Sequence, residues 1–158
     1  MSSKIDKIYG NRVRVRACGL CWQENSLLLI NHKGLTPGNF WSPPGGGIEF
    51  GETAHETVVR EIWEETGLEV TAGSFLFACE YIKNPLHAVE LFFEVNVSGG
   101  ELGVGYDPEM GAEKQLLHEV CFMPYRAIRN LALHERHKML SLFETPELLK
   151  NAVGYWKI

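Results

Sequence analysis

GGIEFGETAHETVVREIWEETGL, residues 46–68, places a glycine run directly before a segment that is rich in acids. Thr53 and Glu56 have the spacing of a capping box, so a helix is expected to begin here. Gly67 is expected to end the helix, because glycine readily takes the left-handed conformation after a last helical turn. The stretch therefore predicts a loop followed by one well-delimited helix.

The acidic charge of the chain is concentrated around this helix. The whole chain of 158 residues has a formal net charge of −5. Residues 49–69 alone contain seven glutamates and one arginine, a net charge of −6, so the rest of the chain is nearly neutral. Most charge clusters form a solvated helix face. The positions of the acids on this helix argue against a purely solvated face.

Two of these acids fall on the apolar side of the predicted helix. At about 100° per residue, Glu61 and Glu65 project within about 20° of Ala54. A helix that only packs on a core keeps its acids opposite the apolar stripe. Acids four residues apart also repel one another. The arrangement favours a cation between the carboxylates, and carboxylate oxygens are preferred ligands of Mg²⁺.

The glycine run 45–47 leaves the backbone before the helix unobstructed by side chains. A carbonyl there can bind a metal ion, and an amide can approach a phosphate. The chain lacks the Gly-Lys-Ser/Thr end of a P-loop, so that motif is excluded. Glycines followed by helical acids indicate phosphate chemistry that depends on a metal ion.

The remaining pattern predicts one α/β domain over residues 1–158. Alternating or apolar runs predict strands, and the composition beyond Pro124 is typical of helices. The loop 33–47 is expected to hold at most a short strand around Phe40 and Trp41, and residues 98–111 are expected to form a long loop. The other expected elements are strands at 12–17, 27–30, 75–82, 88–97 and 116–123, and helices at 125–133, at 135–143 and after Thr145-Pro146.

Gly46, Glu52 and residues 60–68 occupy every defined position of the Nudix box, so the chain resembles the Nudix hydrolase family. The resemblance implies an α/β/α sandwich with a mixed central sheet. It also implies hydrolysis, dependent on Mg²⁺ or Mn²⁺, of a nucleoside diphosphate linked to another moiety. ADP-ribose or a nucleotide sugar, a modified nucleoside triphosphate and a dinucleoside polyphosphate all stay open as substrates.

The resemblance also implies roles for individual residues. The expected metal ligands are Gly45, through its carbonyl oxygen, and Glu61, Glu64 and Glu65. Arg60 and Glu52 are expected to brace the loop against the helix. The general base is left open between Glu61, Glu65 and a loop acid, Glu113.

Substrate contacts are predicted less directly. Arg14 and Arg16 lie on one face of the first strand, where they either form a solvated edge or meet substrate phosphates. Phe40 and Tyr81 either stack on a base or belong to the core.

Three alternatives accompany this interpretation. A Nudix-fold sensor would bind a nucleotide without cleaving it. Cys18 and Cys21 have zinc-like spacing but are expected to be core thiols, because odd spacing on a strand points them to opposite faces. His134 and His137 are three residues apart and are expected to be surface histidines.

Composition limits the compartment and the partners. No uncharged apolar run approaches the roughly 18 residues that a membrane span needs. The N-terminal residues have no apolar stretch typical of a secretory signal, so a cytoplasmic location is expected. A mildly acidic domain argues against nucleic acid and membranes as partners. A small-molecule nucleotide is the expected partner, and a homodimer is compatible with the sequence.

Overall fold

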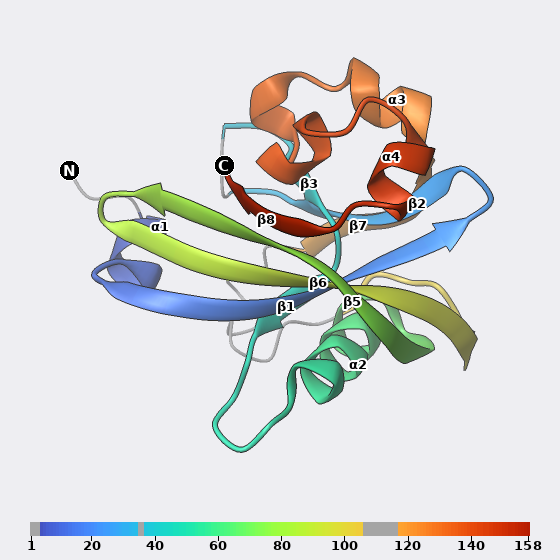
Figure 1. The fold of residues 1–158 in the computed structure, drawn as a ribbon, viewed down its shortest axis with the longest axis horizontal. Coiled ribbons are helices and arrows are strands. Elements are labelled where there is room, and N and C mark those ends of the chain that lie inside the picture. Colours follow the sequence, from blue (N-terminus) through green and yellow to red (C-terminus); the bar gives the residue numbers. More distant parts are fainter. Residues whose placement is uncertain (1–3, 35–36, 106–116) are drawn as a thin grey trace.

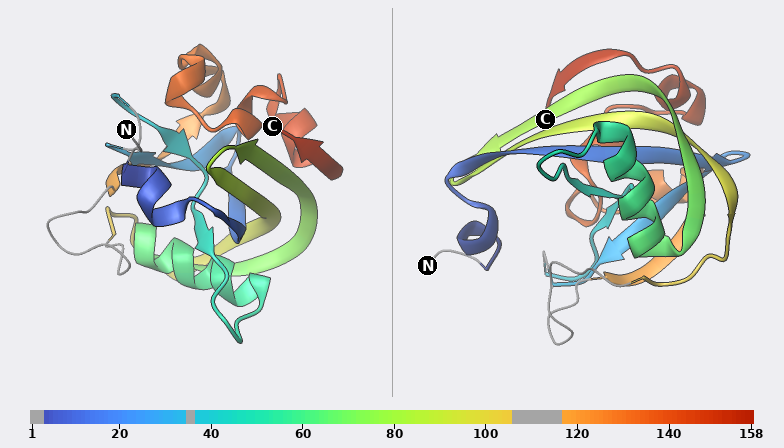
Figure 2. Two further views of the ribbon diagram at one scale, coloured as in Figure 1. Left: turned by 90° about the vertical axis from the view of Figure 1, so that its left-hand side faces the viewer. Right: turned by 90° about the horizontal axis from the view of Figure 1, so that it is seen from below.

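A curved mixed β-sheet has helix α2 on one face and the C-terminal helices on the other (Figure 1). This computed structural model describes residues 4–34, 37–105 and 117–158. Figure 2 shows α2 lying across the strands on its side of the sheet. The arrangement confirms the α/β/α sandwich expected from the sequence.

The sheet contains eight strands, accompanied by four α-helices and two short 3-10 helices in the described ranges. In chain order the elements are α1 (Lys4–Tyr9), β1 (Arg12–Gln23), β2 (Ser26–His32), β3 (Trp41–Ser42), β4 (Gly45–Gly47), α2 (Ala54–Thr66), β5 (Leu68–Lys83), β6 (Leu86–Gly100), β7 (Leu117–Pro124), α3 (Tyr125–Asn130), η2 (Leu133–Glu135), η3 (Lys138–Ser141), α4 (Pro146–Lys150) and β8 (Gly154–Lys157).

The pairing of β1 with β6 is the step that positions the site. The strand order is β3-β2-β1-β6-β5-β8, with β4 paired to β1 and β7 paired to β2. β1 and β6 are parallel, as are β5 and β8, whereas the other pairs are antiparallel. The parallel register sets Arg16 opposite Glu90 and Arg14 opposite Ala88. On its other side, β1 pairs with the glycine strand β4, where Arg16 is opposite Gly47.

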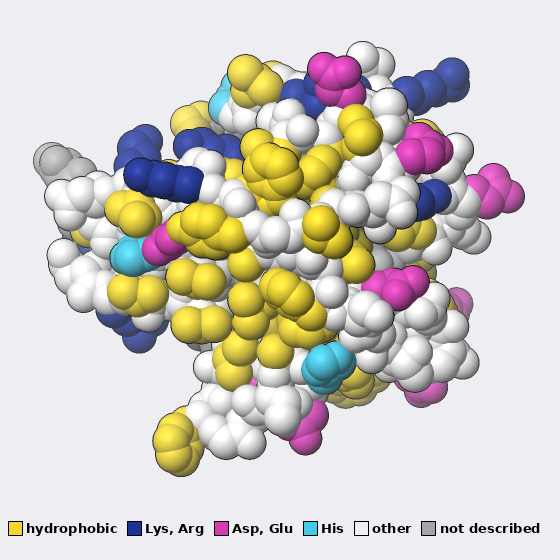
Figure 3. All heavy atoms as spheres, viewed as in Figure 1, with side chains coloured by type: hydrophobic (Ala, Val, Ile, Leu, Met, Phe, Trp, Pro, Cys, Tyr) yellow, Lys and Arg dark blue, Asp and Glu magenta, His cyan; other side chains and the backbone are white. Residues whose placement is uncertain are grey.

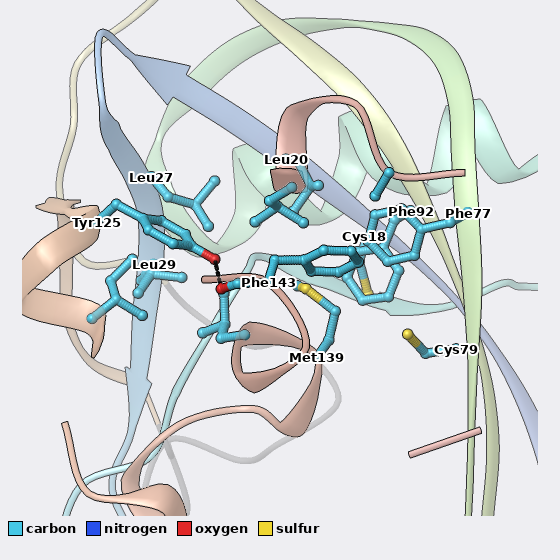
Figure 4. Close-up of a cluster of buried hydrophobic side chains, with 14 of the residues drawn as sticks. Cys18, Leu20, Leu27, Leu29, Phe77, Cys79, Phe92, Tyr125, Met139 and Phe143 are labelled. Carbon is cyan, nitrogen blue, oxygen red and sulfur yellow. Dashed lines mark hydrogen bonds between the residues drawn. The ribbon is translucent and has the colours of Figure 1, made fainter. Parts of the chain in front are cut away.

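One hydrophobic core lies between the sheet and the C-terminal segment. Phe77 and Phe92 stack with ring centroids 4.8 Å apart and pack with Met139 (Figure 4). Tyr125 is buried in the same core, and its hydroxyl donates a hydrogen bond to the carbonyl oxygen of Phe143 at 2.9 Å. The core fixes the segment that carries η3 against the strands.

A second hydrophobic core lies between the sheet and α2. Val58 and Ile62 of α2 are fully buried and pack with Ala17, Phe93 and Val95. This contact sets the side of α2 that faces the sheet. The same side carries the two acids that the sequence places beside the apolar stripe.

Cys18 and Cys21 belong to different cores. Cys18 packs in the core beneath the C-terminal segment, and Cys21 packs in the core beneath α2. The prediction of opposite faces is therefore confirmed. Two thiols on opposite sides of a sheet do not bind one zinc ion together, so the zinc alternative is wrong for this pair. Burial raises the pKa of Cys21 to about 11.

Helix α2 begins and ends where the sequence predicts. The Thr53 side chain accepts a hydrogen bond from the Glu56 amide, and the Glu56 side chain accepts one from the Thr53 amide. Gly67 takes the left-handed conformation, and its amide donates to the Trp63 carbonyl oxygen. Both ends are set by local hydrogen bonds, which explains why the sequence alone predicts them.

The glycine run is a strand, which corrects the expectation of a loop from 33 to 47. β4 pairs with β1 through its backbone, and sheet pairing needs no side chain. The short strand near Trp41 is present as β3.

The C-terminal region is less helical than expected. α3 ends at Asn130, and two 3-10 turns, η2 and η3, replace the predicted helix at 135–143. The His137 side chain caps η3 by accepting a hydrogen bond from the Met139 amide. Such a local side-chain contact offers the backbone an alternative to a continuous helix. Helix α1 and strand β8 are further elements that the sequence pattern did not predict.

The predicted hairpin at 75–97 is confirmed and is longer than expected. β5 and β6 extend to Leu68 and Gly100 and join at a turn that holds Asn84 and Pro85. Part of the expected loop 98–111 is strand, because β6 continues to Gly100, and the predicted strand at 116–123 is present as β7. Residues 101–105 form no helix or strand, as expected, and the remainder of the expected loop, from residue 106, lies outside the described residues.

One face of the molecule carries exposed apolar side chains. Figure 3 shows hydrophobic side chains gathered over the face that holds β5 and β8. Phe75, Tyr155 and Trp156 are among the exposed large side chains of these strands. No helix in the described ranges is long and apolar enough to cross a membrane.

Candidate active site

Strand β4 and helix α2 approach each other closely because β4 consists of glycine. A Cβ atom at Gly46 would lie only 2.0 Å from Glu61 Oε1, and one at Gly45 would lie 2.4 Å from the Ala17 carbonyl oxygen. Real Cβ atoms do not come this close to other heavy atoms. The glycines therefore let backbone and carboxylate share a space that any side chain would fill.

The acids predicted to share the apolar stripe are buried. Glu61 is 9% exposed and Glu65 is 6% exposed, whereas Glu64 is half-buried. Burial raises the pKa of Glu61 to about 7, although the neighbouring Arg60 charge opposes the rise. The Gly45 amide donates a hydrogen bond to Glu65 Oε2 at 3.0 Å. Two carboxylates are thus held beside the glycine backbone.

Arg60 connects the loop with the helix, as the sequence predicts. Its Nε lies 2.7 Å from Glu52 Oε1 and its Nη2 lies 3.0 Å from Glu52 Oε2, a two-pronged ion pair. Arg60 Nη1 also donates to Glu61 at 2.9 Å and to Glu64 at 3.3 Å. The Arg60 hydrogen bonds lower the pKa of Glu52 to about 2. Arg60 therefore balances part of the acidic charge around the helix.

The residues present fit a hard divalent cation. Glu61, Glu64 and Glu65 offer carboxylate oxygens, the ligands that Mg²⁺ and Mn²⁺ prefer. Glycine at residue 46 lets the Glu61 carboxylate lie directly against the backbone, because a Cβ there would clash with it. Within the described ranges, no three His, Cys, Asp or Glu side chains already converge in a metal-holding arrangement, and Arg60 bonds two of the acids. A cation would therefore compete with Arg60 for these carboxylates.

A cavity of about 500 Å³ joins these acids to a more distant wall. Its near end is formed by β4 and α2, and its far end by α1, the β5–β6 hairpin and the segment around η3. All the described residues that the sequence singles out for metal or substrate contact line it: Arg14, Arg16, Phe40, Gly45, Glu61, Glu64, Glu65 and Tyr81.

The far end of the cavity combines aromatic rings with cations. Lys138 Nζ lies 5.0 Å from the centroid of the Tyr81 ring. The Arg14 guanidinium carbon lies 3.9 Å from the centroid of the Tyr9 ring. Lys83 also lines this end. Rings and cations of this kind suit a base or sugar that carries phosphate.

A larger, open hollow of about 780 Å³ shares Glu52 and Arg60 with this arrangement but none of its three helical acids. It is lined by Glu49, Phe50 and neighbouring residues up to Arg60, and by β5 near Val70. None of Glu61, Glu64 and Glu65 reaches it. The smaller cavity is therefore the candidate site.

Sequence reasoning did not find the cavity residues Tyr9, Lys83 and Lys138, nor the buried pair Glu90 and His137. Glu90 is 3% exposed, and Arg16 Nη1 lies 2.5 Å from its Oε1. His137 Nε2 lies 2.6 Å from Glu90 Oε2, so the expectation of a surface histidine is wrong for His137, whereas His134 is exposed. An acid inside the apolar run 88–93 is the signal that could have identified Glu90.

The last predicted residue, Glu113, lies outside the described residues.

The chain matches known proteins over most of this fold. The family model of the NUDIX domain matches residues 10–143. The MutT protein of Methanosarcina mazei Go1 superposes with a TM-score of 0.69 at 17% identity, over 89% of this chain and 96% of that one. The solved structure supports the fold, and the family model covers the acids, the glycine strand and most of the cavity lining, but not Ile5, Tyr9 and Ile158.

Curated relatives match over shorter stretches. An ADP-ribose pyrophosphatase of Methanocaldococcus jannaschii is 40% identical over 91 residues, 56% of this chain and 54% of the relative. An RNA pyrophosphohydrolase of Cereibacter sphaeroides is 38% identical over 58 residues, 32% of this chain and 36% of the relative. The matched stretches thus span about half or less of the relatives' own lengths. Because the family model matches well over half of the chain, the protein belongs to the NUDIX family.

Proposed function

We propose that the protein is a metal-dependent pyrophosphohydrolase that cleaves the phosphoric anhydride bond of a nucleoside diphosphate linked to another moiety. The observation that carries the proposal is the burial of Glu61 and Glu65 against the glycine backbone of β4. Buried acids are costly unless they are compensated, and the single Arg60 charge and the Gly45 amide offset only part of the charge of Glu61, Glu64 and Glu65. The names of the two curated relatives, which both describe cleavage of pyrophosphate groups, support the same reaction.

Glu61, Glu64, Glu65 and the second lone pair of the Gly45 carbonyl oxygen, which also accepts from Arg16, would hold Mg²⁺ or Mn²⁺. When bound, the ion would polarise the phosphoryl oxygens, lower the pKa of the attacking water and screen the acids from an anionic substrate. Arg60 and Glu52 keep the loop and the helix together while Glu61 and Glu64 hold the ion. Without a cation the acids should repel the substrate.

A buried carboxylate is the group best suited to hold the proton of the attacking water. Burial raises the pKa of Glu61 in the metal-free protein, and a carboxylate beside the anhydride is a group that can accept a proton from water. Glu65 lies beside it and is held by the Gly45 amide. Glu61 and Glu65 are the proposed bases, and Glu113 stays a prediction.

The far end of the cavity would bind the part of the substrate beyond the anhydride. Tyr81 and Phe40 offer faces for a base or sugar, and Arg14 and Arg16 offer charge for phosphate oxygens. ADP-ribose is the first substrate to test because the M. jannaschii relative bears that name. A cytoplasmic location, a homodimer and the absence of a nucleic-acid partner stay predictions from the sequence.

A substrate panel with Mg²⁺ or Mn²⁺ tests the proposal. The panel would contain ADP-ribose, a nucleotide sugar, a nucleoside triphosphate, a dinucleoside polyphosphate and a 5′-triphosphorylated RNA, with products separated by chromatography. We expect anhydride cleavage of at least one of these, abolished by a chelator. Tight binding of a nucleotide with no cleavage across the panel would instead identify a sensor.

A further inference from the structure

A continuous chain of contacts joins the C-terminal turn η3 to the glycine strand. His137 Nε2 lies 2.6 Å from Glu90 Oε2, and Arg16 Nη1 lies 2.5 Å from Glu90 Oε1. Arg16 Nη2 then donates to the Gly45 carbonyl oxygen at 3.0 Å. The Gly45 amide in turn donates to Glu65. Both the amide and the carbonyl oxygen of Gly45 therefore form a hydrogen bond.

The central member of the chain is a carboxylate that water hardly reaches. Glu90 lies on β6 between Arg16 of β1 and Cys79 of β5. Burial opposes its ionisation, but the contacts with His137 and Arg16 outweigh burial and lower the pKa of Glu90 to about 2. Burying a carboxylate with two partners costs more free energy than burying an apolar side chain in the same place.

His137 has one ring tautomer that fits its contacts. Its Nδ1 accepts a hydrogen bond from the Met139 amide at 3.1 Å. The ring proton must then be on Nε2, which faces Glu90. The His137 amide also donates to the Trp41 carbonyl oxygen at 2.8 Å, which fixes the backbone before η3. His137 is therefore held with Nε2 facing Glu90 Oε2 at close distance, although the contact is not aligned as a hydrogen bond.

Arg16 is the member of the chain that reaches the site. Its guanidinium is a rigid planar fork, so fixing one arm fixes the direction of the other. Glu90 holds Nη1, and Nη2 points at the Gly45 carbonyl. A shift of Glu90 would therefore move the atom that contacts Gly45.

We propose that Glu90 and His137 are positioning residues that aim Arg16 at the Gly45 carbonyl and so fix the glycine backbone of the site. Their effect on turnover rests on the proposed function, whereas the positioning itself is a property of the protein without metal. Neither residue belongs to the Nudix box stretch, and both act through Arg16.

Two substitutions of His137 separate positioning from packing. In His137→Asn, the amide can replace Nδ1 but does not reach Glu90. In His137→Gln, the amide nitrogen can occupy the place of Nε2 and donate to Glu90. Neither substitution changes the charge of the carboxylate. His137→Gln should therefore rescue what His137→Asn loses.

Glu90→Gln is the second probe, and Glu80→Gln is its control. An amide at residue 90 offers one acceptor and one donor, so it cannot accept from both His137 and Arg16. Glu80 forms a matched carboxylate–histidine pair, with His87 Nε2 2.6 Å from its Oε1, but it does not line the cavity. Thermal unfolding shows which variants fold. The His137 pair decides the proposal if Glu90→Gln does not fold.

Three readouts are combined. The first is the Gly45 amide signal in proton–nitrogen NMR spectra of metal-free protein. The second is the affinity for Mn²⁺, which is measured from the electron paramagnetic resonance signal of the unbound ion. The third is kcat and KM on the substrate that the panel identifies.

For folded His137→Asn and Glu90→Gln, we expect a shifted Gly45 signal, Mn²⁺ affinity weaker by about 10–100-fold and a fall in kcat of the same order. KM should change less than kcat. His137→Gln and Glu80→Gln should stay close to the parent in all three readouts.

An unmoved Gly45 signal in folded His137→Asn would overturn the proposal, as would equal losses in His137→Asn and His137→Gln. If the parent binds no Mn²⁺ and cleaves no substrate, the proposed function fails, and the Gly45 signal alone then decides the positioning.

Discussion

Gly45 donates its amide proton to Glu65, with 3.0 Å between the nitrogen and Oε2, and both residues are buried. The hydrogen bond joins the strand before the helix to the last turn of the helix itself. It explains why an acid can lie on the packed side of α2: the carboxylate replaces lost water with a backbone donor. Backbone and acids of the site therefore form one unit, and substitutions in either should affect the other.

The first prediction concerns the close approach of Gly46 to Glu61. Gly46→Ala would place a methyl group 2.0 Å from Glu61 Oε1, so the carboxylate or the strand must move. We expect loss of Mn²⁺ binding and destabilisation by about 1–3 kcal/mol, the range of overpacking in a filled space. Urea unfolding and metal titration measure both effects.

Gly47→Ala is the matched control, because a Cβ at Gly47 would meet no atom within 4 Å. It should be far milder than Gly46→Ala in both measurements. Equal effects of the two substitutions would show that the contact with Glu61 is not the cause.

The second prediction concerns the fork of Arg60. Arg60→Lys keeps the charge but cannot hold Glu52, Glu61 and the Gly47 carbonyl oxygen at once, as Arg60 does. We expect a loss of stability of about 2 kcal/mol, the order of a hydrogen bond to a charged group. Chemical unfolding of the metal-free proteins measures it, and a lysine variant as stable as the parent would contradict the bracing role.

The third prediction is a dependence of stability on pH through Glu52. Its pKa is lowered from 4.5 to about 2 in the folded protein, mainly because Arg60 donates to it. Its contribution to stability is therefore present above pH 4.5 and is lost as pH falls toward 2. Glu52→Gln should destabilise the protein near neutral pH and matter progressively less in acid. A stability difference between parent and variant that is the same at pH 6 and pH 3 would contradict this account.

The fourth prediction concerns the thiols. Cys18, Cys21 and Cys79 are buried, whereas Cys121 is half-buried. A thiol reagent should modify Cys121 first in the folded protein, and the other three only as fast as the protein opens. Mass spectrometry of partly labelled protein identifies the site. Fast labelling of Cys18 would show that the core beneath the C-terminal segment is open in solution.

Local signals made α2 predictable. Its two ends are set by hydrogen bonds within a few residues, at Thr53 and at Gly67, and its buried acids follow from helical periodicity. The contact between Arg60 and Glu52 is similarly local, because it joins the helix to the loop just before it. The half of the site that lies in residues 45–65 could therefore be described from the sequence.

The other half depends on pairing between distant segments. Glu90 meets Arg16 because β1 and β6 pair in parallel, and hydrophobic patterns do not specify which strands become neighbours. His137 reaches Glu90 because the chain forms 3-10 turns where composition favours a helix. The glycine strand β4 has no side-chain pattern from which a strand could be recognised. These three features depend on packing between segments that are far apart in the sequence, and no local sequence pattern indicates that packing.

The acids of α2 are proposed to act through a metal ion on an anhydride bond. The most direct measurement compares the parent with Glu64→Gln on the best substrate of the panel, at saturating Mg²⁺ and with a chelator. Glu69→Gln is the control, since Glu69 is an exposed acid of the same acidic segment and does not line the cavity.

We predict that the chelator abolishes cleavage by the parent and that Glu64→Gln lowers turnover by roughly 10²–10⁴-fold while remaining folded. Glu69→Gln should cleave like the parent. Equal turnover by folded Glu64→Gln and the parent at saturating Mg²⁺, or cleavage that persists in the chelator, would contradict the account.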